Sequence, residues 1–235
     1  MVSAERCAFG PIDPEQTTEH HLQRYAVYAL DQPRQCKVVA IAEPRKNTRT
    51  LFAKAHAVDN TLVFNTWQDL HKASTETLAT VGKRLADAVI VAVQDNMHKD
   101  VVLAFAQQGY HILCEKPMAT NLSDLIAMEK AVEEAGIIFG VGHGMHTPAS
   151  GDQAFDIRVV LRYSPYTRAV TEVVRSGQLG ELVNAVHIEP VGYFHFAHSY
   201  VRGHWAKEAE SSFSLMTKSC QYVSLVLCVH TSLIQ

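Results

Sequence analysis

Apolar residues in the middle of the chain form short continuous runs that alternate with longer amphipathic stretches. Runs of this kind are typical of parallel strands that are covered on both faces. The runs that predict strands are Lys37–Ala42, Leu62–Phe64, Ala88–Val93, Tyr110–Cys114 and Ile137–Val141. Because helical patterns lie between these runs, the sequence predicts an α/β fold with a doubly wound parallel sheet.

Helices are predicted between the strands from the spacing of apolar residues and from the residues that end them. The predicted helices are Tyr25–Leu30, Asn47–Ala57, His98–Gln108 and Leu122–Ala135. Gly109 and Gly136 follow the last two, where a helix commonly ends.

The pattern changes beyond Ser150. Ser164 and Pro165 are a typical N-cap and first helical residue, and they predict a helix that runs through Val174. Leu182–Val191 then alternates like a half-buried antiparallel strand. These elements predict a second α+β domain that is truncated.

Composition narrows the choice of function class. The chain has 235 residues, of which 47% are hydrophobic and 19% charged, as in an ordinary globular protein. Its net charge of -3 argues against nucleic acid or an anionic membrane surface as a partner. The apolar stretch Tyr222–Ile234 is too short and too interrupted to cross a bilayer. Five cysteines without a CxxC pair argue against a disulfide framework or a structural zinc site, so a reducing, cytoplasmic setting is expected.

Polar residues that follow two of the predicted strands are candidates for dinucleotide binding. Glu43 comes directly after Lys37–Ala42, where an acid accepts hydrogen bonds from an adenosine ribose diol. Arg45 could instead favour a 2'-phosphate, so the choice between NAD and NADP stays open. The alternative is that Glu43 is a solvated loop residue. Gln94–His98 follows Ala88–Val93 at the edge where α/β sheets bind ligands, although Asn96 could simply cap the next helix.

A Glu-Lys-Pro segment follows the strand Tyr110–Cys114. Pro117 keeps Lys116 out of the helical region, which holds the lysine extended at the mouth of the sheet. A lysine in this place could hydrogen-bond or protonate a substrate oxygen beside a nicotinamide. The alternative is an ordinary surface lysine.

These segments together resemble the glucose-fructose oxidoreductase / inositol dehydrogenase / MocA (Gfo/Idh/MocA) family. Ala-Glu-Pro at 42–44, Gln-Asp-Asn-Met-His at 94–98 and Cys-Glu-Lys-Pro at 114–117 have the family's order and spacing. Segments 161–166, 177–180 and 202–205 resemble parts of its substrate domain. The resemblance implies a Rossmann-type domain and an NAD(P)-dependent oxidoreductase that acts on a sugar, a cyclitol or a related alcohol or dihydrodiol.

The resemblance also assigns residues to roles. Lys116 would be catalytic, beside the nicotinamide and the substrate hydroxyl. The residues expected to bind NAD or NADP are Glu43, Arg45, Gln94, Asn96, His98, Glu115 and Lys116. The residues expected near a small-molecule substrate are Arg162, Tyr163, His204 and Trp205.

The chain departs from the family pattern at three places. Two prolines in Phe9–Pro14 and the lack of glycine in Thr18–Arg24 predict that the first strand and the Gly-rich loop are missing. Residues 144–159 form an insertion, and Gln221 stands where the family has a histidine that can do acid/base work. These departures predict an incomplete or alternatively spliced member with impaired activity. The alternative function is a non-catalytic nucleotide-binding or subunit-interaction module.

The expected domain organisation follows from these boundaries. It has an atypical segment at 1–24, an NAD(P)-binding domain at 25–143, the insertion at 144–159 and a truncated substrate domain at 160–235. A homo-oligomer through the sheet of the last domain is expected. His195 and His198 would face opposite sides of a strand, so no metal site is predicted.

Overall fold

The computed structural model describes residues 5–9, 26–142, 165–181, 183–184, 186, 188, 190–207 and 211–219. For residues 5–9 and for residue 204 only the backbone is described. We refer to all of these as the described residues.

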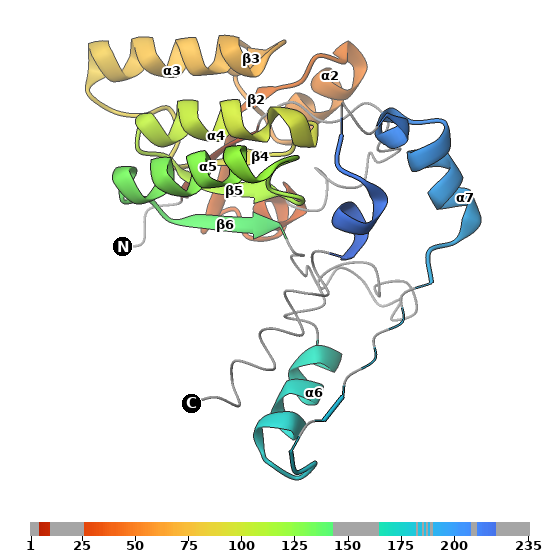
Figure 1. The fold of residues 1–235 in the computed structure, drawn as a ribbon. Coiled ribbons are helices and arrows are strands. Elements are labelled where there is room, and N and C mark those ends of the chain that lie inside the picture. The colour runs from red at the N-terminus through yellow and green to blue at the C-terminus, as the bar shows by residue number, and fades with distance from the viewer. Residues whose placement is uncertain are drawn as a thin grey trace.

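A parallel sheet of six strands is the centre of the fold (Figure 1). Its strands are β1 (Glu5–Phe9), β2 (Cys36–Ala42), β3 (Val63–Phe64), β4 (Ala88–Val91), β5 (His111–Glu115) and β6 (Phe139–Gly142). The order across the sheet is β3-β2-β1-β4-β5-β6, and every neighbouring pair is parallel. All carboxyl ends therefore lie along one edge, and the order reverses between β1 and β4, where folds of this class bind ligands.

The prediction that the first strand is missing is wrong. Glu5–Phe9 forms β1, which pairs with β2 on one side and with β4 on the other. The strand is hard to recognise because two of its five residues are charged, so it lacks the continuous apolar run of the other strands. Pro11 and Pro14 come after its last residue and do not interrupt the pairing. The segment that follows β1 thus begins at Gly10 and not at Thr18, and residues 10–25 lie outside the described residues.

Helices cover both faces of the sheet, as the alternating pattern predicts. They are α2 (Lys46–Ala55), α3 (Trp67–Val81), α4 (His98–Gln107) and α5 (Leu122–Ala135), with a further helical segment at 26–31. Short 3-10 helices, η1 (Asn60–Leu62) and η2 (Asp95–Met97), lie in the connections. The predicted helices are confirmed to within two residues at their ends. The helix α3 was not predicted, although residues typical of helix ends stand on either side of it. Thr66 accepts a hydrogen bond from the Asp69 backbone N–H at its start, and Gly82 follows its last residue with a φ of 70°.

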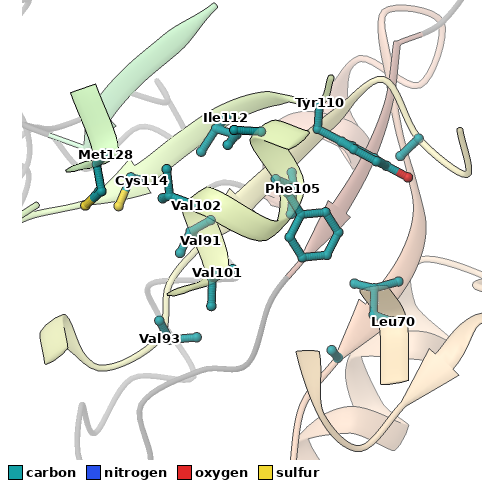
Figure 2. Packing of buried hydrophobic residues seen from close by; sticks show 14 of the residues in the cluster. Leu70, Val91, Val93, Val101, Val102, Phe105, Tyr110, Ile112, Cys114 and Met128 are labelled. Carbon is teal, nitrogen blue, oxygen red and sulfur yellow. The ribbon is translucent and has the colours of Figure 1, made fainter. Parts of the chain in front are cut away.

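Two hydrophobic clusters show that the sheet is doubly wound. Val89 and Val91 belong to the larger cluster, beside α3, α4 and α5, whereas Ile90 belongs to the smaller one, with α2 and segment 26–31. This alternation follows from the period of two along a strand. In the larger cluster Phe105 and Tyr110 pack edge to face with ring centroids 5.3 Å apart (Figure 2). Both faces of the central strands are therefore buried.

The described C-terminal part is mainly helical. It contains α6 (Pro165–Arg175), α7 (Tyr193–Phe196), the π-helix η4 (Ala197–Val201), the 3-10 helix η5 (His204–Ala206) and a helical segment at 214–219. The helix from Pro165 is confirmed. In Figure 1, α6 stands away from the sheet, while α7 lies beyond the ends of the strands.

The strand predicted over Leu182–Val191 is not present in the described residues of that range. These residues are unpaired, and Val183 and Ile188 are 93% and 80% exposed. An alternating pattern becomes a strand only where a neighbouring strand and a core are available, and no described strand pairs with it. The expectation that His195 and His198 lie on a strand is also wrong, because they lie in α7 and η4.

No helix in the described part of the chain combines the length and the apolar character that a bilayer span requires.

Candidate functional site

Three segments meet at the carboxyl edge of the sheet. Residues 94–98 follow β4, residues 115–118 begin at the last residue of β5, and residues 211–219 come from far along the chain. Hydrogen bonds join the third segment to each of the other two. This junction contains five of the seven residues expected to bind the cofactor.

Lys116 lies at the centre of the junction. Its Nζ donates to the backbone oxygen of Thr217 at 2.9 Å, and its backbone N–H donates to Glu115 Oε2 at 3.1 Å. The side chain is partly buried, and the peptide bond to Pro117 is cis. Lys116 is thus placed at the mouth of the sheet, as its position after β5 predicts.

Asp95 fixes the C-terminal segment to the loop after β4. The Asp95 side chain is buried, and its Oδ2 accepts from the Ser212 backbone N–H at 2.9 Å. The Ser212 hydroxyl is also buried and has no hydrogen-bond partner among the described residues. A charged group that accepts a buried hydrogen bond holds the two segments together more strongly than a neutral pair would.

His98 points into the protein and not toward solvent. It is 1% exposed, with Nδ1 at 2.9 Å from the Pro117 oxygen and Nε2 at 3.1 Å from the Val93 oxygen. Burial lowers the pKa of His98, and hydrogen bonding to these two carbonyl groups opposes part of that effect. The imidazole therefore connects the end of β4 to the loop that carries Lys116.

Gln94 and Asn96 are less involved in the junction. Gln94 is half-buried, and its backbone oxygen accepts from the Met97 N–H at 2.9 Å. Asn96 is exposed. The residue before α4 is Met97, which makes no side-chain capping bond, so Asn96 is not the N-cap of that helix.

Glu43 and Arg45 form a second polar group at the same edge, at the end of β2. Glu43 is fully buried, and its Oε1 accepts from the Arg45 backbone N–H at 2.7 Å and from Arg45 Nε at 3.0 Å. Arg45 Nη2 lies 3.3 Å from Glu43 Oε2. Glu43 is therefore not a solvated loop residue, because its charge is paired inside the protein.

The residues predicted to contact substrate are only partly described. Arg162 and Tyr163 lie outside the described residues, as do the insertion at 144–159 and Gln221. His204 begins η5, but its side chain is not described. Trp205 lies 6.5 Å from the Tyr200 ring, and its buried Nε1 has no partner among the described residues. The structure does not bring Trp205 into a described hydrogen bond with the junction.

Three residues that contribute to the site were not selected from the sequence. Asp95 and Thr217 contact residues more than 100 positions away in the chain, and no local pattern predicts such contacts. Arg49 Nη1 donates to the backbone oxygens of Glu43 and Pro44. Arg49 lies in the first turn of the predicted helix, close after Glu43 and Arg45 in the chain, and that position is the signal that could have identified it.

No group of three or more His, Cys, Asp or Glu side chains suited to a metal ion occurs in the part of the chain that the structure describes. Cys114 is buried there, and burial raises the pKa of its thiol. A buried, protonated thiol is a poor metal ligand and a poor nucleophile.

Comparison with known proteins identifies a family and several relatives. Residues 20–143 match the model of a family described as an oxidoreductase family with an NAD-binding Rossmann fold. The 2,7-anhydro-N-acetylneuraminate hydratase of Escherichia coli is 43% identical over 68 residues, which cover 29% of this chain and 18% of that protein. The 1,5-anhydro-D-fructose reductase of Ensifer adhaerens is 28% identical over 132 residues, which cover 54% of this chain and 35% of that protein.

The fold is shared with solved structures. The myo-inositol 2-dehydrogenase of Lactobacillus plantarum matches with a TM-score of 0.70 and 16% identity, over 97% of this chain and 56% of that chain. The chain spans about a third or less of the length of the two curated relatives. The family model, however, matches just over half of this chain, which therefore belongs to the Gfo/Idh/MocA oxidoreductase family with an NAD-binding Rossmann fold.

Proposed function

We propose that this chain binds NAD or NADP at the carboxyl edge of its sheet and transfers a hydride between the nicotinamide and an alcohol carbon of a sugar or cyclitol. The observation that carries the proposal is the position of Lys116, a partly buried lysine held where β5 ends. Ligands of this fold class bind along that edge.

The side chains at the edge fit a dinucleotide in their chemistry. Arg45 and Arg49, after the end of β2, can bind the polar or anionic groups of the adenosine part of the cofactor. Lys116 and Glu115, at the end of β5, can meet the polar nicotinamide and substrate end. The nicotinamide would supply the site that accepts or gives the hydride.

Lys116 would act on the substrate oxygen. During oxidation of an alcohol the C–H bond is broken as a hydride, and the hydroxyl must also release its proton. A lysine amine hydrogen-bonded to that oxygen can take the proton, and the ammonium can return it in the reductive direction. Nζ uses one of its donor positions on the Thr217 carbonyl, so a substrate oxygen can bind to Nζ beside that carbonyl.

The substrate class is inferred from the relatives. By their names, the Ensifer protein reduces an anhydro sugar and the Escherichia coli protein acts on an anhydro sialic acid. We therefore propose a ring-shaped polyhydroxy substrate, and a related alcohol or dihydrodiol fits the same chemistry.

A second candidate function is nucleotide binding without turnover, for example as a subunit-interaction module. Two hydrogen bonds favour it, from Lys116 to Thr217 and from Ser212 to Asp95, because they place residues 211–219 against the proposed reaction site. Gln221, which stands in the chain at the place of the family's histidine, favours it as well.

A turnover assay separates the two functions. Purified protein would be incubated with NAD or NADP and a panel of inositols, aldoses, anhydro sugars and dihydrodiols while the absorbance of the reduced nicotinamide is followed. Appearance of reduced cofactor with one substrate class is expected for the enzyme. Cofactor binding without reduction on any member of the panel would favour the non-catalytic module.

The remaining expectations stay predictions. They are a cytoplasmic location, a homo-oligomer that forms through the C-terminal domain, and the domain boundaries at residues 24, 143 and 159. Size-exclusion chromatography with light scattering would test the oligomer.

A further inference from the structure

We propose that Arg45, assisted by Arg49, makes this chain selective for NADP(H) over NAD(H) by binding the 2'-phosphate. This inference rests on the proposed function, since it requires a dinucleotide at the carboxyl edge. It concerns which of the two cofactors the end of β2 accepts.

Glu43 and Arg45 differ in their exposure to solvent, and this difference determines which of them a bound ribose would contact. The Glu43 side chain is 0% exposed, whereas the Arg45 side chain is 31% exposed. Arg45 uses its backbone N–H, Nε and Nη2 on the carboxylate. Of the two side chains only Arg45 is accessible to solvent, so the member of the pair that a ligand can contact is a cation.

A free ribose diol would be a poor partner for this arrangement. NAD is recognised in this fold class when an acid accepts hydrogen bonds from the 2'-hydroxyl. To do so here, the diol would have to displace Arg45 from a buried carboxylate. The neutral diol would compete there with a charged partner that makes several hydrogen bonds, so the exchange is unfavourable.

A 2'-phosphate would be a good partner for the same arrangement. Arg45 Nη1 makes no hydrogen bond to another described residue, so its N–H groups can bind a phosphate oxygen while Nε and Nη2 stay on Glu43. A guanidinium has five donors, which is enough to bind a carboxylate and a phosphate at the same time.

The charges around Arg45 favour the same ligand. Residues 43–49 contain three cations, Arg45, Lys46 and Arg49, and a single anion, Glu43. The first turn of α2 contains no acidic residue. Arg49 lies beside the pair, since its guanidinium donates to the Glu43 and Pro44 backbone oxygens. A phosphate monoester, with nearly two negative charges, would balance this excess.

Direct titration tests the inference. The fluorescence of NADPH and of NADH would each be followed on addition of the unmodified chain, and 2',5'-ADP and 5'-AMP would be compared as competitors. We expect NADPH to bind about 10- to 100-fold more tightly than NADH, and 2',5'-ADP to show the same preference over 5'-AMP. Equal or tighter binding of NADH would overturn the inference and leave the proposed function standing. Binding of neither dinucleotide would overturn both.

Two variants localise the effect. Arg45→Gln is expected to weaken NADPH binding about 10-fold or more and to change NADH binding less than about 3-fold. Lys54→Gln, at the other end of α2, is the matched control and should leave both affinities unchanged. Thermal melts of both variants would confirm folding. A folded Arg45→Gln protein that keeps its full preference for NADPH would show that Arg45 does not select the phosphate.

Discussion

Replacing Lys116 with methionine is expected to lower kcat/KM for alcohol oxidation by about 100- to 10,000-fold, the range that a single proton-transfer group commonly contributes. Methionine keeps most of the length of the side chain but can neither donate nor accept the proton. Because Lys116 lies at the nicotinamide end of the proposed site, and not in the Glu43–Arg45 group, cofactor affinity should fall by less than about 10-fold, which is less than the loss in kcat/KM. Initial rates and a cofactor titration on the same preparation would measure both quantities.

Lys130→Met is the matched control, since Lys130 is an exposed lysine that faces Glu134 on α5. Its kcat/KM should equal that of the unmodified chain. If Lys116→Met kept more than about a third of the unmodified rate, Lys116 would not be the proton-transfer group.

Replacing His98 with alanine is expected to lower the free energy of unfolding by about 3 kcal/mol, because the change leaves a cavity and a buried carbonyl group without its partner. The neutral ring has a single N–H, which donates to the carbonyl of Val93 or to that of Pro117, on either side of the fully buried ring. Denaturant unfolding would measure the loss. His56→Ala is the control, since His56 is only partly buried, and it should cost less than about 1 kcal/mol.

The pH dependence of stability provides an independent test of His98. Burial lowers its pKa, so between that value and about 6.5 the unfolded chain binds more protons than the folded chain. The free energy of unfolding should therefore fall as pH drops below about 6.5, by at most about 1.4 kcal/mol per pH unit from this group. His56 contributes in the same direction, since burial lowers its pKa too.

In His98→Ala the fall in stability between about pH 6.5 and 5 should be reduced compared with the unmodified chain and with His56→Ala. An unchanged slope in His98→Ala would mean that His98 does not titrate differently on folding.

Most of the sheet domain could be predicted from the sequence because its signals are local. A buried parallel strand such as Ala88–Val91 needs a continuous apolar run. Helices such as α4 and α5 are followed by Gly109 and Gly136, which have φ angles of 74° and 62°. Five strands and most of the helices follow from these patterns.

The parts that were predicted wrongly depend on their surroundings. Glu5–Phe9 is a strand because β2 and β4 offer two edges to it, although its own composition does not predict one. The range 182–191 has the alternating composition of a strand, but no described strand pairs with it. Pairing partners decide both cases, and they are not visible in a local pattern.

The candidate site could be predicted in position but not in detail. Glu43 and Lys116 follow strands, and the ends of parallel strands meet at one edge, so the sequence places both residues there. The contacts that define the chemistry of these two residues could not be predicted, because they depend on the folded structure. Thr217 reaches Lys116 across 101 positions, and the placing of Arg45 over Glu43 depends on the burial of the carboxylate.

A thermal melt of the purified chain, with and without millimolar NAD(H) and NADP(H), tests the central claim most directly. A ligand that binds only the folded state raises the apparent stability by mass action. A cooperative transition that shifts upward with cofactor is expected, with the larger shift for NADP(H). A cooperative transition that neither cofactor moves would contradict dinucleotide binding at the carboxyl edge of the sheet.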